Sequence, residues 1–103
     1  MKKLINDPRR VVPEMLEGLV ATAPGLALLD GMNVVVRADA PVHGEVALIS
    51  GGGAGHEPAH AGYVGAGMLT AAVSGEVFTS PSTDAVVAAI RAVSGGAGVL
   101  LVV

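Results

Sequence analysis

The first part of the chain carries apolar residues at a spacing typical of an amphipathic helix. Three adjacent pairs share one face at about 3.6 residues per turn: Val11, Val12, Met15, Leu16, Leu19 and Val20. The pattern predicts a helix over about 8–22, which Asn6 or Asp7 can cap. Pro13 interrupts it, because an interior proline removes a hydrogen bond and clashes with the preceding turn. We therefore expect a loose first turn and a firm helix from about Pro13.

Farther along the chain, short apolar runs alternate with helical segments. The runs that predict strands cover residues 32–36, 46–50, 68–74 and 98–103. The segments between the last three predict a short helix near 57–63 and a longer one from Ser82 or Thr83, with Val86, Val87, Ile90 and Val93 on its apolar side. This β-loop-α-β-α-β order from about residue 45 implies parallel strands joined by right-handed crossovers. The sequence therefore predicts an α/β fold with a parallel-rich sheet, helices on its faces and the N-terminal helix packed on the sheet.

The last apolar run, 99–103, has no polar alternation. Such a run is typical of a central parallel strand that is covered on both faces. In open α/β sheets the loops after the strands help to build the ligand site. We therefore interpret residues 1–103 as the N-terminal part of a larger domain.

Composition and charge narrow the class of protein. The chain is 51% hydrophobic with two aromatic residues, which suits a packed α/β domain and argues against disorder. A net charge of −3 without a basic face argues against nucleic-acid and anionic-membrane binding. The chain has no cysteine, which excludes a Cys-ligated metal site within it. The start lacks the apolar segment of a signal peptide, and no apolar run is long enough to span a bilayer, so we expect a cytoplasmic protein.

The run Ser50-Gly-Gly-Gly-Ala-Gly-His-Glu-Pro58 carries the candidate chemistry. We expect its glycines to form a loop after the strand 46–50. Glycine permits positive φ and lets a ligand approach bare peptide N–H groups. His56 stands at the exit of this loop and is suited to proton transfer near neutral pH. On these residues alone, His56 is either an acid/base beside a small polar substrate or a histidine that only structures the loop.

We compared residues 50–60 with three known sequence motifs. A dinucleotide fingerprint needs a third glycine where His56 stands, and a phosphate loop needs a lysine after Gly55, so both fail. Residues 56–60 do match H-E-x-x-H, in which two histidines of a regular helix bind zinc and the glutamate acts as a base. Pro58 conflicts with that helix unless it lies in the first turn. A zinc hydrolase remains a minor alternative, and we expect His60 to cap or pack on the short helix.

A second polar segment, 75–81, follows the next predicted parallel strand and should end on the same edge of the sheet. Glu76, Thr79 and Ser80 offer hydrogen-bonding groups there, and Ser80 is a candidate substrate contact. The alternative is that Thr79 and Ser80 only cap the next helix. Arg37 and Asp39 are expected to form a local ion pair.

Together these motifs resemble one family. The segments Ser-Gly-Gly-Gly-Ala-Gly-His-Glu-Pro-Ala-His-Ala-Gly-Tyr-Val-Gly (50–65), Gly-Met-Leu (67–69) and Gly-Glu-Val-Phe-Thr-Ser-Pro (75–81) are similar to the substrate-binding K subunit or domain of dihydroxyacetone (glycerone) kinase. The opening Met-Lys-Lys-Leu-Ile-Asn-Asp and Arg-Ala-Asp-Ala-Pro-Val (37–42) also fit. The resemblance covers essentially all 103 residues.

The resemblance implies phosphoryl transfer to a hydroxyl of dihydroxyacetone. It implies that His56 is the general base and that the backbone of Gly53, Ala54 and Gly55 contacts the substrate. Ala54 replaces a serine common in the family, a small change that leaves the backbone contacts intact. The histidine that holds the ketone covalently, and a lysine and an aspartate of the pocket, are expected beyond Val103. We therefore expect residues 1–103 alone to be inactive.

The resemblance also implies partners. ATP or ADP with Mg²⁺ is expected on a separate nucleotide-binding L domain or subunit, and no cofactor on this segment. The phosphoryl donor is either ATP itself or a phosphocarrier protein that acts through that partner, and the full-length protein is expected to be a homodimer. The alternative is a non-catalytic ketone-binding or regulatory module with the K-domain architecture.

Overall fold

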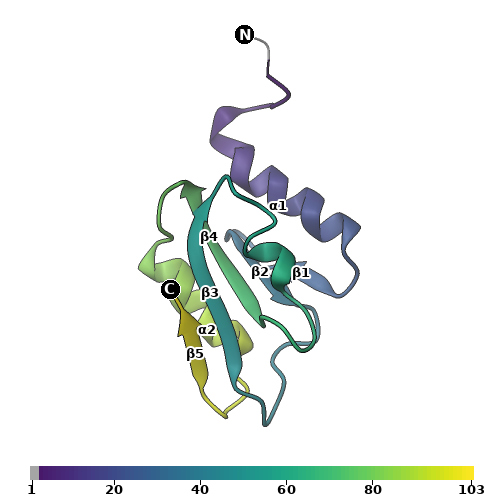
Figure 1. Cartoon of the computed structure of the whole chain (residues 1–103), viewed down its shortest axis with the longest axis vertical. Helices are drawn as coiled ribbons and strands as arrows, with labels where there is room; N and C mark the ends of the chain where they lie inside the picture. Colours follow the sequence, from purple (N-terminus) through teal and green to yellow (C-terminus); the bar gives the residue numbers. More distant parts are fainter. Residues whose placement is uncertain (1–2) are drawn as a thin grey trace.

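The computed structural model describes residues 3–103 as one five-stranded sheet with helices on both faces (Figure 1). The helices are η1 (Pro8–Arg10) and η2 (Ala61–Tyr63), both 3₁₀, and α1 (Val11–Thr22) and α2 (Thr83–Val93). The strands are β1 (Leu26–Leu28), β2 (Val34–Arg37), β3 (Ala47–Ala54), β4 (Ala71–Val77) and β5 (Val99–Val102). Within residues 3–103, no helix has the length and apolar character needed to cross a membrane.

The strand order is β1-β2-β4-β3-β5, and the sheet is mixed. The strand β3 pairs in parallel with both β4 and β5, as the alternating pattern predicts. The strands β1 and β2 pair antiparallel, and β2 pairs antiparallel with β4. The sequence did not predict β1, because three residues are too few to show a periodicity. The sheet therefore has a parallel half, β4-β3-β5, whose carboxyl ends form the candidate site. The antiparallel strands β1 and β2 lie beside it.

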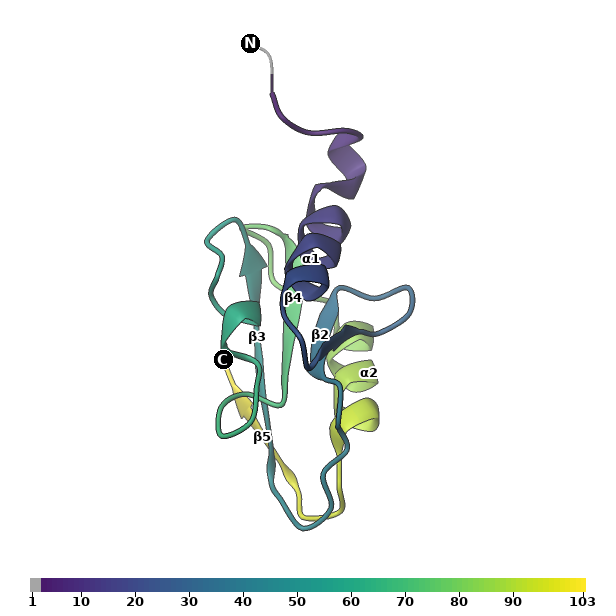
Figure 2. The ribbon, with the colours of Figure 1, turned by 90° about the vertical axis from the view of Figure 1, so that its right-hand side faces the viewer.

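Two apolar layers hold the helices against the sheet. On one face α2 packs against alternate residues of β2 and β3, among them Val34, Val36 and Ile49. On the other face α1 and η2 pack against the intervening residues, such as Val35. Figure 2 shows α2 and η2 on opposite sides of the sheet. The N-terminal helix thus packs on the sheet as predicted.

The N-terminal helical segment covers residues 8–22 as predicted, but its α-helical part begins slightly earlier than expected. The loose first turn is the 3₁₀ helix η1, in which the Asp7 carboxylate accepts a hydrogen bond from the Arg9 N–H. The α-helix then starts at Val11, and the expectation of a start at Pro13 was wrong. Pro13 is the third residue of α1, where a backbone N–H would have no partner within the helix, so the proline costs little.

The helix α2 has its predicted cap but a different buried face. Ser82 Oγ accepts a hydrogen bond from the Ala85 N–H at 3.2 Å. The buried residues are Ala85, Ala89 and Val93, whereas Val87, placed on the apolar side by the sequence, is exposed. Small side chains at four-residue spacing let the helix lie close to the sheet. The larger apolar residues of α2 then flank this line of contact.

The strand β5 lies at an edge of the sheet and pairs only with β3. Its residues Leu100, Leu101 and Val102 are exposed. Within residues 3–103 this strand is neither central nor covered on both faces, and its central position in the larger domain stays a prediction. An uninterrupted apolar run indicates that both faces of a strand are able to be buried. Within residues 3–103, however, no helix or strand covers most of β5.

The predicted ion pair between Arg37 and Asp39 is formed at the end of β2. Arg37 donates two hydrogen bonds to the carboxylate, from Nε to Oδ1 at 2.9 Å and from Nη2 to Oδ2 at 2.7 Å. The guanidinium is also 3.7 Å from the Glu45 carboxylate. The hydrogen bonds from Arg37 lower the pKa of Asp39 below its ordinary value of 3.8.

We expect Asp39→Asn to destabilise the protein near neutral pH but not in strong acid. A carboxyl group whose pKa is lower in the folded than in the unfolded chain stabilises the fold above the unfolded value. That contribution disappears as the pH falls through the folded-state pKa, which lies below 3.8. Thermal unfolding of both proteins from pH 7 to pH 2 measures the difference. In an Arg37→Gln background the substitution should have no such pH-dependent effect, and a difference that persists at pH 2 would argue against this role of the pair.

Candidate functional site

The glycine run is mostly strand. The strand β3 continues through Gly51, Gly52 and Gly53 to Ala54 and pairs with β4, with a register shift after Gly52. Of the glycines in the run, only Gly55 has a positive φ, at 108°. The expectation of a loop from residue 51 was therefore wrong. The backbone groups of this stretch bond to a neighbouring strand, and the exposed turn begins at Gly55.

Gly53 of this run and Gly75 of β4 permit close packing of the backbone. A Cβ at Gly53 would lie 2.9 Å from the backbone nitrogen of Thr79 and 3.0 Å from Cα of Phe78. A Cβ at Gly75 would collide with the carbonyl oxygen of Thr79. The segment 75–81 therefore folds directly against the end of β3. This confirms that the two segments share one edge of the sheet.

Phe78 makes the turn that brings this segment back. Its φ is 53°, in the left-handed region that bulky residues rarely adopt. Its N–H donates to the carbonyl oxygen of Ala54 at 2.8 Å, which continues the pairing one residue past β4. The phenyl ring lies over Gly55, with its centroid 6.5 Å from that of His56. The sequence does not predict this role of Phe78, because side-chain type alone does not indicate a left-handed backbone.

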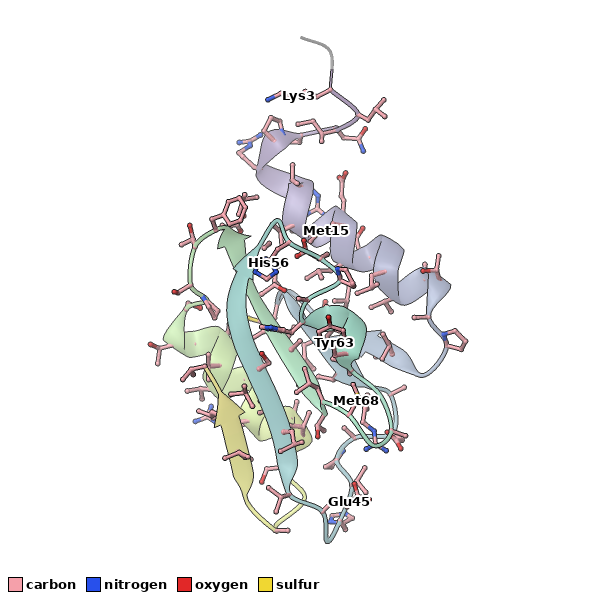
Figure 3. The ribbon with its side chains drawn as sticks, viewed as in Figure 1. Lys3, Met15, Glu45, His56, Tyr63 and Met68 are labelled. Carbon is pink, nitrogen blue, oxygen red and sulfur yellow. The ribbon has the colours of Figure 1, made fainter. Side chains whose placement is uncertain are left out.

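His56 lies in an exposed turn at the carboxyl end of β3 (Figure 3). The Gly55 N–H donates to the Glu57 carboxylate at 3.0 Å, which closes the turn. The His56 imidazole stands between two rings, with centroid distances of 6.5 Å to Phe78 and 6.0 Å to His60. An exposed imidazole beside bare glycine backbone is placed to exchange a proton with a small bound molecule.

His60 is bonded to the sheet and does not cap the short helix. It is the residue before η2, but its side chain makes no capping hydrogen bond there. Its Nδ1 lies 2.9 Å from Oγ of Ser50, a residue that is only 3% exposed. Its ring packs on Tyr63 of η2, with centroids 6.1 Å apart. The expectation that His60 packs on the helix is confirmed, and the expectation of a cap is wrong.

The H-E-x-x-H match does not have the geometry of a zinc protease. Residues 57–60 form a turn, and η2 begins only at Ala61, so the two histidines do not lie on one helix face. Glu57 is bonded to the backbone of its own turn, and His60 to Ser50. In residues 3–103 no three His, Asp or Glu side chains come together as a set of metal ligands. The zinc reading of the motif is therefore not supported by this fold.

Ser80 lies at the same edge as His56 but lines a cavity. The cavity has a volume of about 430 Å³. Its polar lining comes from the residue before β2, from the end of β4 and from the segment that leads into α2: Asn33, Ser74, Glu76, Thr79, Ser80 and Ser82. Ser82 caps α2, and the Thr79 hydroxyl donates to the carbonyl oxygen of Val77. The alternative that Thr79 and Ser80 cap the helix is therefore wrong. The Ser80 side chain remains a candidate substrate contact.

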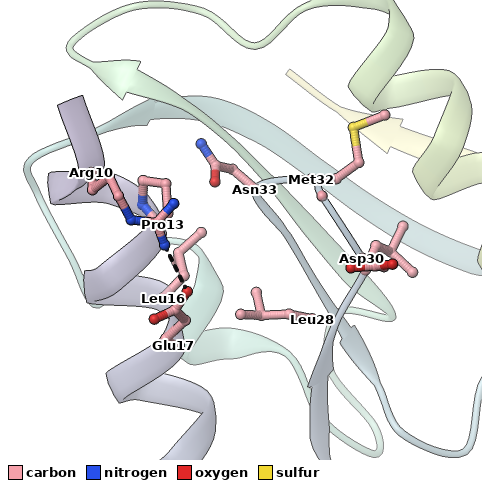
Figure 4. A pocket seen from close by; sticks show the side chains of 10 residues that line it. Arg10, Pro13, Leu16, Glu17, Leu28, Asp30, Met32 and Asn33 are labelled. Carbon is pink, nitrogen blue, oxygen red and sulfur yellow. Dashed lines mark hydrogen bonds and ion pairs between the residues drawn. The ribbon is translucent and has the colours of Figure 1, made fainter.

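Another cavity, of about 450 Å³, lies between α1 and the connection of β1 to β2 (Figure 4). The Arg10 guanidinium pairs with the Glu17 carboxylate at 3.2 Å on its wall. None of the predicted site residues lines this cavity. The predicted site residues therefore favour the carboxyl end of β3, and not this cavity, as the candidate site.

A comparison with protein families matches residues 17–103 to the Dak1 domain. The chain belongs to the Dak1 family. It is 54% identical over 103 residues to the PEP-dependent dihydroxyacetone kinase, dihydroxyacetone-binding subunit DhaK, of Escherichia coli (strain K12), covering 100% of this chain and 29% of that protein. The Dak1 chain spans less than a third of the length of such curated relatives.

Two solved structures share the Dak1 fold. The dihydroxyacetone kinase from C. freundii, in complex with AMP-PNP and Mg²⁺, superposes with a TM-score of 0.91 at 48% identity, over 99% of this chain and 20% of that one. The dihydroxyacetone kinase operon co-activator Dha-DhaQ superposes with a TM-score of 0.81 at 45% identity, over 87% of this chain and 28% of that one. The α/β fold with its mixed five-stranded sheet is therefore that of the dihydroxyacetone kinase domain.

We expect Gly53→Ala to lower the free energy of unfolding by about 1–3 kcal/mol, the usual cost of overpacking. The new methyl group would press on the backbone of Thr79 and Phe78. Gly52→Ala is the matched control, because a Cβ there meets nothing within 4 Å. Alanine should be neutral there or stabilise the fold by up to about 1 kcal/mol, since it restricts the unfolded chain. Chemical denaturation measures both, and equal losses would contradict the close approach.

Proposed function

We propose that this chain is the dihydroxyacetone-binding part of a dihydroxyacetone kinase and that His56 is its general base. One observation carries the proposal. The exposed imidazole stands at the end of the parallel strand β3, beside the glycine backbone and the Phe78 ring, in a chain 54% identical to a dihydroxyacetone-binding subunit. Parallel sheets place ligands at this end of their strands.

In the proposed mechanism His56 accepts the proton of the substrate hydroxyl as that oxygen attacks the phosphoryl group. The bond from this oxygen to phosphorus forms while the bond from phosphorus to the donor breaks, and the imidazole retains the proton. The backbone of Gly53, Ala54 and Gly55 and the hydroxyl of Ser80 orient the small ketone. In phosphoryl transfer the acceptor side contributes chiefly positioning and proton removal. These are functions that the residues of this edge are able to supply.

The proposal assigns the phosphoryl donor to another part of the enzyme. The glycine run has neither the phosphate-loop lysine nor the dinucleotide pattern, so we place ATP or ADP with Mg²⁺ on a separate L domain or subunit. The C. freundii structure contains AMP-PNP and Mg²⁺, and the E. coli relative is named PEP-dependent. These names support keeping both ATP and a phosphocarrier relay as proposed donors. We further propose that the covalent histidine lies outside residues 1–103 and that the complete protein is a cytoplasmic homodimer.

A regulatory module is the second candidate. The observation that favours it is the likeness to the operon co-activator Dha-DhaQ, with a TM-score of 0.81. A regulator of this kind would bind the ketone without turnover. Calorimetric titration with dihydroxyacetone, followed by an assay for its phosphorylation with the nucleotide-bearing partner, separates the two functions.

In the complete protein, we expect His56→Asn to lower kcat by about 10²- to 10⁴-fold, the usual contribution of general acid–base catalysis. Binding of dihydroxyacetone should change much less, because the glycine backbone remains in place. His43→Asn is the matched control, since His43 is exposed in the connection between β2 and β3. Steady-state kinetics with the nucleotide-bearing partner provide the measurement. Full turnover by His56→Asn would remove the general-base assignment.

A further inference from the structure

The orientation of the His56 imidazole depends on neighbouring rings and not on hydrogen bonds to its own nitrogens. Within residues 3–103 no hydrogen bond to its ring is formed. It stands instead in a row of rings from Phe78 through His56 and His60 to Tyr63, with neighbouring centroids 6.5, 6.0 and 6.1 Å apart. The direction in which His56 presents its nitrogens therefore depends on its two neighbours in the row.

These two neighbours are held in different ways. Phe78 is 77% exposed and is fixed through its backbone by the bond to Ala54. His60 is also exposed, but its Nδ1 is tied to the buried hydroxyl of Ser50 at 2.9 Å. This is the one side-chain hydrogen bond, among residues 3–103, that joins the segment 56–60 to the sheet.

Ser50 is a rigid anchor for this bond. Its backbone lies in the parallel half of the sheet, in register with Ala72 of β4 on one side and Val102 of β5 on the other. Its side chain is buried, so the hydroxyl has few alternative partners. If the buried hydroxyl lost its hydrogen-bond partner, the folded state would be destabilised. This favours the conformation in which Ser50 and His60 are bonded. The sheet therefore fixes the position of the His60 ring ten residues farther along the chain.

We propose that Ser50 and His60 are positioning residues that orient the His56 imidazole for proton transfer. The proposal rests on the proposed function of His56. The chain of contacts runs from the paired backbone of β3, through the Ser50 hydroxyl, to the His60 ring and then to the His56 ring. Neither Ser50 nor His60 needs to touch the substrate for this role.

The test uses the complete protein with its nucleotide-bearing partner. Ser50→Ala and His60→Phe each remove the hydrogen bond, and His60→Phe keeps an aromatic ring beside His56. We expect each to lower kcat by about 10- to 100-fold, the loss typical of a misplaced reacting group, with KM changed less than about 3-fold. His43→Asn again serves as the control. His60→Phe leaves the buried Ser50 hydroxyl without its partner, whereas Ser50→Ala leaves an exposed imidazole that water can solvate. Ser50→Ala therefore tests the proposal even if His60→Phe lowers the stability, which melting curves monitor.

Combining these variants with His56→Asn separates positioning from a general structural role. If Ser50 and His60 act only through His56, Ser50→Ala and His60→Phe should cause no further loss of kcat in the His56→Asn background. A full additional loss in that background would overturn the proposal, and so would unchanged kcat in the single variants. If His56→Asn retains full activity, the proposed function fails, and the positioning role fails with it. If His56→Asn alone loses turnover, only the inference about Ser50 and His60 fails.

Discussion

The geometry of the candidate site depends on the close approach of two backbone segments at the carboxyl ends of β3 and β4. Gly53 leaves no room for a Cβ between β3 and residues 78–79, and Gly75 leaves none between β4 and residues 79–81, which turn back against it. This contact presses residues 78–80 against β3 and makes Phe78 adopt a left-handed conformation, which costs on the order of 1–3 kcal/mol. The surrounding pairing of β3 with β4 and β5 has to supply that energy. The parallel half of the sheet thus stabilises the backbone conformation of the candidate site.

The sequence predicts the parallel half of the fold well because two independent signals agree there. Apolar runs alternate with helical segments, and a cap residue marks the start of α2. The extent of β3 was not predictable in the same way, since glycine is a strong signal for a loop. In the structure the ladder with β4 outweighs this tendency, because its hydrogen bonds use only backbone groups and the missing side chains allow close packing. The strand β1 was not predictable, because its three residues show no periodicity.

The sequence predicts the edge of the sheet at which the candidate site lies. His56 and the segment that contains Ser80 do end on the same edge. The side chains that surround His56 were not predictable. A hydrogen bond between Ser50 and His60 depends on the path of the turn 55–60 that follows β3. The position of the Phe78 ring depends on a φ that few phenylalanines adopt. Such features follow from tertiary packing and not from spacing along the chain.

The exposure of His56 limits what these residues are able to do alone. Charge that develops in a transition state is stabilised best by groups in a site from which water is excluded. In residues 3–103 the imidazole and the turn that carries it face outward, and the net charge of the chain is −3, which does not favour an approaching phosphate. The proposed reaction therefore needs a positively charged cover at this edge. In the proposed reaction, Mg²⁺ and the nucleotide-bearing partner would supply that charge, whereas this chain would supply the proton acceptor and the rigid backbone that holds the ketone.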